Sequence, residues 1–229
     1  MAVTHINSVG ASATGATTSA TFPGEVSPGS LIVVCVNKTD ASGSFAEIVA
    51  ADLTKTGGTA TIGAIALDKK STARTYGAYR MQSAIFSFPV TAGGSLTMRI
   101  AGASAGGSCL ISISEFLGEF RDALWTWATA EGNDSTGAPT TSAMNGSHSG
   151  VFVGMVSTGT TGATTHTVGV DYTQIYEEEN GSSYATGSME FRIVSAFTKD
   201  AADWVAPTTV PWTAAGVFYI EKRTWSQHN

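Results

Sequence analysis

The chain has 229 residues, enough for a packed core, and only 13% of them are charged, against roughly 25% in an average soluble domain. The 12 basic residues are scattered and the formal net charge is −6, so the sequence predicts no nucleic-acid partner. No apolar run approaches the roughly 20 residues of a membrane span, and the first residues lack the basic and apolar regions of a secretory signal. We therefore expect a folded protein with a polar, uncharged surface, made in the cytoplasm and without a membrane partner.

The first predicted elements are a strand over residues 3–9 and a Gly/Ala/Ser/Thr tract over residues 10–20. The tract fits an exposed loop or a flat edge strand. The most distinctive element follows at residues 30–36, an unbroken apolar run between turn residues at 27–29 and 37–40. Because this run is β-branched and too short for a typical helix, it predicts a strand buried on both faces.

Further strands are expected in the rest of the first half. Residues 44–51 and 60–67 flank Gly57-Gly58, a pattern that predicts a hairpin. Two more strands are expected at residues 74–81 and 84–90.

The clearest strand of this half covers residues 96–100. Leu96, Met98 and Ile100 alternate with polar residues, so one face is expected to be buried and the other hydrated. A strand over residues 109–116 then closes the half.

Residues 119–149 form a bridge to the second half. Residues 119–130 fit a helical turn or a strand, and residues 132–139 carry loop signals. A domain boundary here is conceivable. We favour a crossover within one sandwich, because each half alone is short of strands for two sealed sheets.

The second half repeats the order of the first. Its predicted elements are a buried strand at 150–156, a strand at 166–176, a hairpin turn at 177–181, an alternating strand at 188–194 and a closing strand at 217–222. The turn contains Asn180-Gly181, the preferred pair of a type I′ turn.

The repeated order indicates two similar halves. Leu31 and Val151 open the equivalent buried strands and lie 120 residues apart, about half the chain. Many short strands are separated by Gly, Pro and Asn turns, and no long helix is expected. The sequence therefore predicts an all-β sandwich or barrel.

Two patterns of reactive residues are weak. Residues 102–106 match G-x-S-x-G, the pattern around the nucleophilic serine of many hydrolases. That arrangement needs a helix after the serine, and here a strand follows. A chance match is expected in a chain with 26 glycines. Residues 177–179 are all glutamate and, with Asp171, offer the oxygen ligands that Ca²⁺ prefers. They lack the alternating spacing of a calcium loop and lie at a predicted hairpin tip, so we expect solvated charge and predict no metal site.

A carboxylate pair can also be read from the sequence. Glu115 and Glu221 occupy equivalent places in the two closing strands. Glycoside hydrolysis requires two carboxyl groups flanking a cleft, and both residues are more simply strand-end residues. We therefore predict no catalytic residue and no cofactor.

The two cysteines, Cys35 and Cys109, lie in apolar strands. We expect both to be buried thiols that pack as small hydrophobic residues. A disulfide between neighbouring strands stays open, although synthesis in the cytoplasm argues against it.

The tryptophans are candidates for contacts. Trp125 and Trp127 alternate in the bridge, and Trp212 and Trp225 lie towards the C-terminus. Tryptophan in loops stacks on sugars or anchors protein interfaces, and core packing is the alternative for each. We take Trp125, Trp127, Trp212 and Trp225 as interface candidates, with Trp225 the first choice for a contact between subunits.

Three features resemble the jelly-roll-like β-sandwich proteins of tailed phages. They are the strand at residues 28–36 after a Ser/Thr/Ala-rich start, residues 92–98 leading into residues 111–118, and the weaker copy of this order in the second half. The likeness covers most of the chain and transfers no functional residue. It implies a role on the virion surface, in capsid decoration, capsid cementing or the tail.

Together these observations predict one β-sandwich domain of jelly-roll type over residues 1–229, with similar halves at about 1–118 and 119–229. We expect a structural virion protein rather than an enzyme, first of all a capsid decoration or cement protein made in the host cytoplasm. Its expected partners are further copies of itself and other virion proteins such as the major capsid protein. The alternative is a carbohydrate-binding module or tail adhesin that binds glycans with loop tryptophans.

Overall fold

The computed structural model describes residues 2–15, 17–102, 107–120, 126–134, 138–146, 148–159, 165–180, 185–196, 198–206 and 209–222. Apart from one 3-10 turn, the regular structure within these ranges is β throughout. The predicted all-β sandwich is confirmed, and its jelly-roll type stays a prediction. In the described part of the chain, no helix is long and apolar enough to cross a membrane.

The elements of the first half are β1 (Thr4–Thr14), β2 (Thr17–Thr21), β3 (Leu31–Ala41), η1 (Ala50–Asp52), β4 (Leu53–Gly57), β5 (Thr61–Ile62), β6 (Ala66–Lys70), β7 (Arg74–Tyr76), β8 (Tyr79–Ala92), β9 (Thr97–Ala101) and β10 (Ser108–Leu117). Those of the second half are β11 (Thr126–Asp134), β12 (Met144–Gly146), β13 (Gly150–Thr158), β14 (Thr167–Val168), β15 (Thr173–Asn180), β16 (Ala185–Val194), β17 (Thr198–Asp200), β18 (Trp204–Val205) and β19 (Trp212–Ile220).

The two large sheets share a strand order. In the first half the order is β1-β10-β3-β8-β5, with β6 and β7 also paired to β8, and in the second half it is β11-β19-β13-β16-β15. In each sheet the opening strand pairs with the closing strand, which pairs with the central apolar strand, and all these pairs are antiparallel. Each main position in one sheet therefore has a counterpart in the other.

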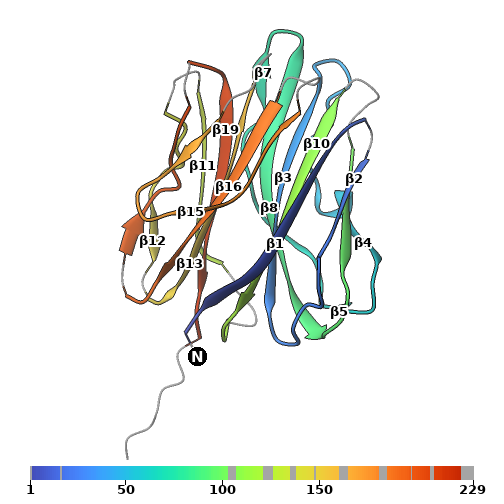
Figure 1. Cartoon of the computed structure of the whole chain (residues 1–229). Helices are drawn as coiled ribbons and strands as arrows, with labels where there is room; N and C mark the ends of the chain where they lie inside the picture. Colours follow the sequence, from blue (N-terminus) through green and yellow to red (C-terminus); the bar gives the residue numbers. More distant parts are fainter. Residues whose placement is uncertain are drawn as a thin grey trace, which may run out of the picture.

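The sheets form four layers (Figure 1). The two large sheets pack against each other through a core that includes Val33 of β3 and Val153 of β13. A second core lies between the first large sheet and the small sheet β2-β9-β4. On the far side, the pairs β12-β17 and β14-β18 cover the second large sheet. The strands β3 and β13 are therefore buried on both faces, as the unbroken apolar runs predict.

Polar contacts also join the two large sheets. Ser12 Oγ donates to Glu178 Oε1 at 2.7 Å between the edge strands β1 and β15. Tyr219 of β19 donates to Asp68 Oδ2 of β6 at 2.7 Å. At Gly10 of β1, a Cβ atom would lie 2.3 Å from the ring of a tyrosine on β15, so the glycine allows the two edges to approach. These contacts and the shared core make one packed unit of the two sheets.

The strand β3 is longer than predicted. The expected turn at residues 37–40 is wrong, because β3 continues to Ala41 along the long partner strand β8. Lys38 is 1% exposed and Asp40 is fully buried. The Lys38 ammonium lies 5.5 Å from the ring centroid of Phe45, which covers this end of the sheet.

The hairpin expected at Gly57-Gly58 is also wrong. The strand before it, β4, pairs with β9, and the strand after it, β5, pairs with β8. Gly58 has a φ of +91°, and a Cβ atom there would lie 2.0 Å from the backbone oxygen of Ser95. Here glycine permits a close backbone approach instead of a two-residue hairpin turn.

The glutamate run at residues 177–179 belongs to β15 and is not a solvated hairpin tip. Glu177 contacts His166 and Glu178 contacts Ser12, so both carboxylates are used within the fold. Of the predicted turn at residues 177–181, only Gly181 lies outside the described residues.

Both cysteines are free and buried, as expected. Cys35 lies in the core between the two large sheets, whereas Cys109 lies in the core on the opposite face of the first sheet. Because the two thiols face different cores, they form no disulfide.

Candidate functional site

The most exposed large apolar side chains of the described residues lie on the outer layer of the second half. Val170 is 83% exposed and Val205 is 59% exposed. Val170 lies in the turn between β14 and β15, where Tyr172 N donates to Gly169 O at 3.1 Å. Val205 lies on β18, the strand that pairs with β14. We call residues 169–172 the braced turn, because two side chains of β16 hold it in place.

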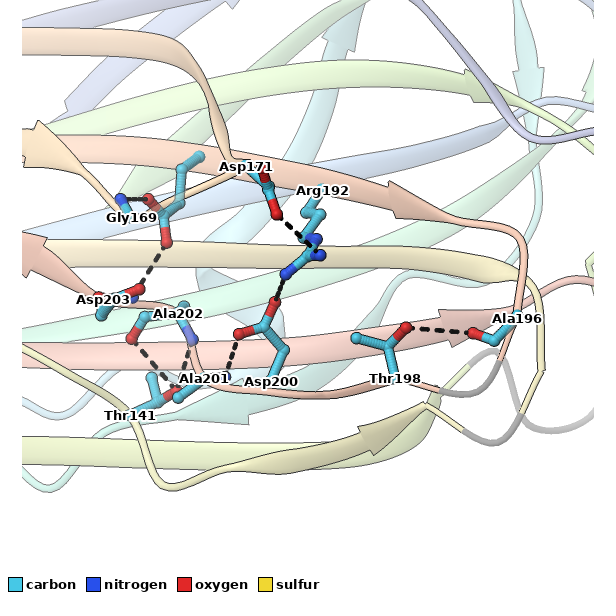
Figure 2. Close-up of polar contacts among 11 residues, drawn as sticks. Thr141, Gly169, Asp171, Arg192, Ala196, Thr198, Asp200, Ala201, Ala202 and Asp203 are labelled. Carbon is cyan, nitrogen blue, oxygen red and sulfur yellow. Dashed lines mark hydrogen bonds and ion pairs between the residues drawn. The ribbon is translucent and has the colours of Figure 1, made fainter.

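The first brace is Glu190 of β16, whose side chain is fully buried. Its Oε2 atom accepts a hydrogen bond from Gly169 N at 3.1 Å, and its Oε1 atom accepts one from Asp203 N at 3.1 Å. Figure 2 shows these two donors. One carboxyl group therefore fixes both the start of the turn and the approach to β18.

The second brace is an ion-pair network around Arg192, also on β16. Arg192 lies between two carboxylates, with Nη2 3.1 Å from Asp171 Oδ2 and Nη1 2.5 Å from Asp200 Oδ2 (Figure 2). Asp171 has a φ of +67° and is the only non-glycine residue with positive φ in the described part of the chain. Aspartate tolerates this left-handed conformation better than most residues. The partly exposed ion pairs contribute little stability, so their main effect is to orient the turn.

Burial sets the charge of the first brace. Burial above all, and the nearby Asp203 and Asp200 carboxylates, raise the pKa of Glu190 to about 9, against the opposing effect of its two backbone donors. Burial and Asp200 also raise the pKa of Asp203. Glu190 is therefore neutral at pH 7, which is why a carboxyl group without a cationic partner is tolerated there.

These acidic side chains do not form a metal site. Among the described residues, no group of three or more His, Cys, Asp or Glu side chains is arranged to hold a metal ion. The site instead presents exposed apolar side chains beside the exposed Asp171 and Asp203.

A second polar group lies inside the same half. The Nε2 atom of His166 is 3.2 Å from Thr158 Oγ1, and its Nδ1 atom is 3.0 Å from Glu177 Oε1. Burial alone would raise the pKa of Glu177, but hydrogen bonds from His166 hold it below its ordinary value. The order of hydroxyl, imidazole and carboxylate is that of a hydrolytic triad. However, Thr158 is fully buried and His166 is 2% exposed, so the group joins β13 to β15 and offers no accessible nucleophile.

The tryptophans predicted for contacts are only partly placed. Trp212 is 4% exposed and packs beside Trp204 in the core under the outer layer. Trp212 therefore presents almost no surface to a partner or a glycan. Trp125 and Trp225 lie outside the described residues, and Trp127 lies on β11 with its side chain outside the description, so these three stay predictions.

The carboxylate pair of the closing strands is not brought together. Glu115 is 1% exposed, and its Oε1 atom accepts a hydrogen bond from Ser27 N at 2.6 Å within the first half. Glu221 follows β19 in the second half and forms an isolated bridge with Phe120. The serine of the G-x-S-x-G match, Ser104, lies outside the described residues.

The sequence pattern failed to identify the braces. Glu190 and Arg192 lie on the polar face of an alternating strand, where solvent exposure is the ordinary expectation. That face is covered by β14 and β18, which have two residues each and leave no periodic pattern in the sequence.

Comparison with known proteins adds no relative. No protein-family model, curated protein or solved structure matches the chain.

Proposed function

We propose that the chain is a structural virion protein of a tailed phage, with capsid decoration or cementing as its role, and that it acts through protein–protein contacts. The observation that carries the proposal is the braced turn. It presents an 83% exposed valine on a turn held by a buried carboxyl group and an ion-pair network.

Preorganisation is the physical reason that this turn suits a contact. Ordering a loop during binding lowers affinity, and a loop that is already fixed avoids this loss. Exposed apolar residues beside polar groups also match the composition of protein interfaces, which have an apolar centre and a polar rim. The low content of charged residues and the jelly-roll resemblance agree with a virion surface protein.

Mass spectrometry of purified particles tests the proposal. Tailed-phage particles from cells that encode this chain should contain it in a fixed ratio to the major capsid protein. Particles made without the chain should bind the added recombinant protein. Val170→Ser should weaken this binding, because it removes the exposed apolar side chain without touching the braces.

The matched control is Ile6→Ser on β1, where another apolar side chain is 46% exposed. This variant should bind particles as the wild type does. Intact particles that lack the chain, or equal loss of binding in both variants, would contradict the proposal. Loss of binding after addition of free sugars would favour the glycan-binding alternative.

A further inference from the structure

The two halves of the chain differ in charge. Residues 1–118 contain seven basic and six acidic residues, a formal net charge of +1, whereas residues 119–229 contain five basic and twelve acidic residues, a formal net charge of −7 that counts the neutral Glu190. The acidic excess includes the exposed Asp171 and Asp203 beside Val170. A surface that binds the braced turn should therefore be cationic, because complementary charge steers association and like charges oppose it.

The outer face of the sheet β2-β9-β4 carries an exposed cation at its centre. Arg99 of β9 is exposed at the centre of this sheet, and its register partners are Ser19 of β2 and Thr54 of β4. Two small side chains, Ser19 and Thr54, therefore flank one guanidinium group on this face. A guanidinium group binds carboxylates through parallel hydrogen bonds, which gives both attraction and orientation.

We propose that the braced turn of one copy docks on the outer β2-β9-β4 face of a second copy. Arg99 of the second copy binds the carboxylates of Asp171 and Asp203, and Val170 packs against the sheet beside Arg99. The inference rests on the proposed function, because it takes the braced turn as the contact site and names a second copy as its partner.

The layer order gives this contact a direction. The β2-β9-β4 sheet and the layer that holds the braced turn cover opposite outer sides of the two packed large sheets (Figure 1). Each copy therefore offers both surfaces at once, and the contact is head-to-tail. Such a contact can repeat from copy to copy and gives a ring or a filament according to the rotation between neighbours.

Sedimentation velocity of the full chain tests the contact, over a wide range of protein concentration at low and high salt. The wild type should associate, and high salt should weaken the association because it screens exposed charges. Arg99→Glu and Asp203→Lys should each weaken association by about tenfold. The double variant should recover most of the loss, since it restores opposite charges in exchanged positions.

Ile6→Ser should associate as the wild type does, and circular dichroism should show the same fold for every variant. A wild type that stays monomeric at all concentrations would overturn the inference, as would a double variant no better than the single variants. The two proposals fail separately. A monomeric chain found in particles leaves the proposed function standing, whereas a self-associating chain absent from particles leaves only the head-to-tail contact.

Discussion

The variant Glu190→Gln tests whether the buried carboxyl group of the braced turn is neutral at physiological pH. Burial raises the pKa of Glu190 from 4.5 to about 9 in the folded chain. In the unfolded chain the group titrates near its ordinary value. Between these pH values the folded state therefore holds a proton that the unfolded state has released. The stability contributed by Glu190 is complete below about pH 4.5 and is lost as the pH rises towards about 9.

The magnitude follows from this difference in bound protons. One proton held only by the folded state lowers the free energy of unfolding by about 1.4 kcal/mol per pH unit. From about pH 7 to about pH 9 the slope flattens near the folded pKa, so the wild type should lose about 2 kcal/mol from this group. His5 does not contribute to this change. Burial lowers its pKa, so the stability that depends on His5 rises with pH and is complete above the ordinary histidine pKa of 6.5.

Urea unfolding followed by tryptophan fluorescence across this pH interval measures the effect. The glutamine amide cannot lose a proton, so the difference in unfolding free energy between wild type and Glu190→Gln should change by about 2 kcal/mol. The glutamine NH2 group cannot accept one of the two backbone hydrogen bonds of Glu190. This loss lowers the unfolding free energy of the variant by an amount that does not change with pH. The control Glu25→Gln changes an exposed residue and should run parallel to the wild type. Parallel curves for wild type and Glu190→Gln would refute the reasoning.

Three further substitutions test the packing of the sheets. Gly10→Val places a Cβ atom 2.3 Å from a tyrosine ring of β15. It should lower the free energy of unfolding by about 1–3 kcal/mol, measured by thermal melting. The control Gly43→Ala, with no atom within 4 Å of the new Cβ, should leave the melting temperature unchanged. Tyr219→Phe removes the donor to Asp68 at 2.7 Å and should lower the free energy of unfolding in urea by about 1–3 kcal/mol. An unchanged midpoint would contradict a stabilising hydrogen bond there. Val34→Asp places a charge at a fully buried position and should abolish the yield of soluble protein.

The central strands were predictable because their environment is simple. The run at residues 30–36 is apolar without interruption, since cores lie on both faces of β3. The end of β3 was not predictable. Lys38 and Asp40 are turn formers by composition, but β8 is long enough to pair with them, and a loop aromatic covers the lysine. Pairing with β8 and packing against the aromatic side chain therefore outweigh the turn propensity of these residues.

The candidate site was harder to predict for a related reason. Its braces join β16 to a turn and to β18, three segments that lie apart in the sequence. The alternation of β16 shows which residues share a face but not that a further layer covers that face. Glu190 is therefore a buried neutral acid at a position where the pattern predicts a solvated charge.

The layer order also explains where recognition can take place. The two large sheets have the same strand order and cover each other, so their inner faces are closed to partners. The outer layers differ: the first half has one three-stranded sheet, and the second has two separate strand pairs with a braced turn. The halves also differ in formal net charge, +1 against −7. The shared order thus lies in the sheets that form the common core, and the differences lie where a partner can reach. This is the distribution expected of a chain whose two outer sides bind different surfaces, as a head-to-tail contact requires.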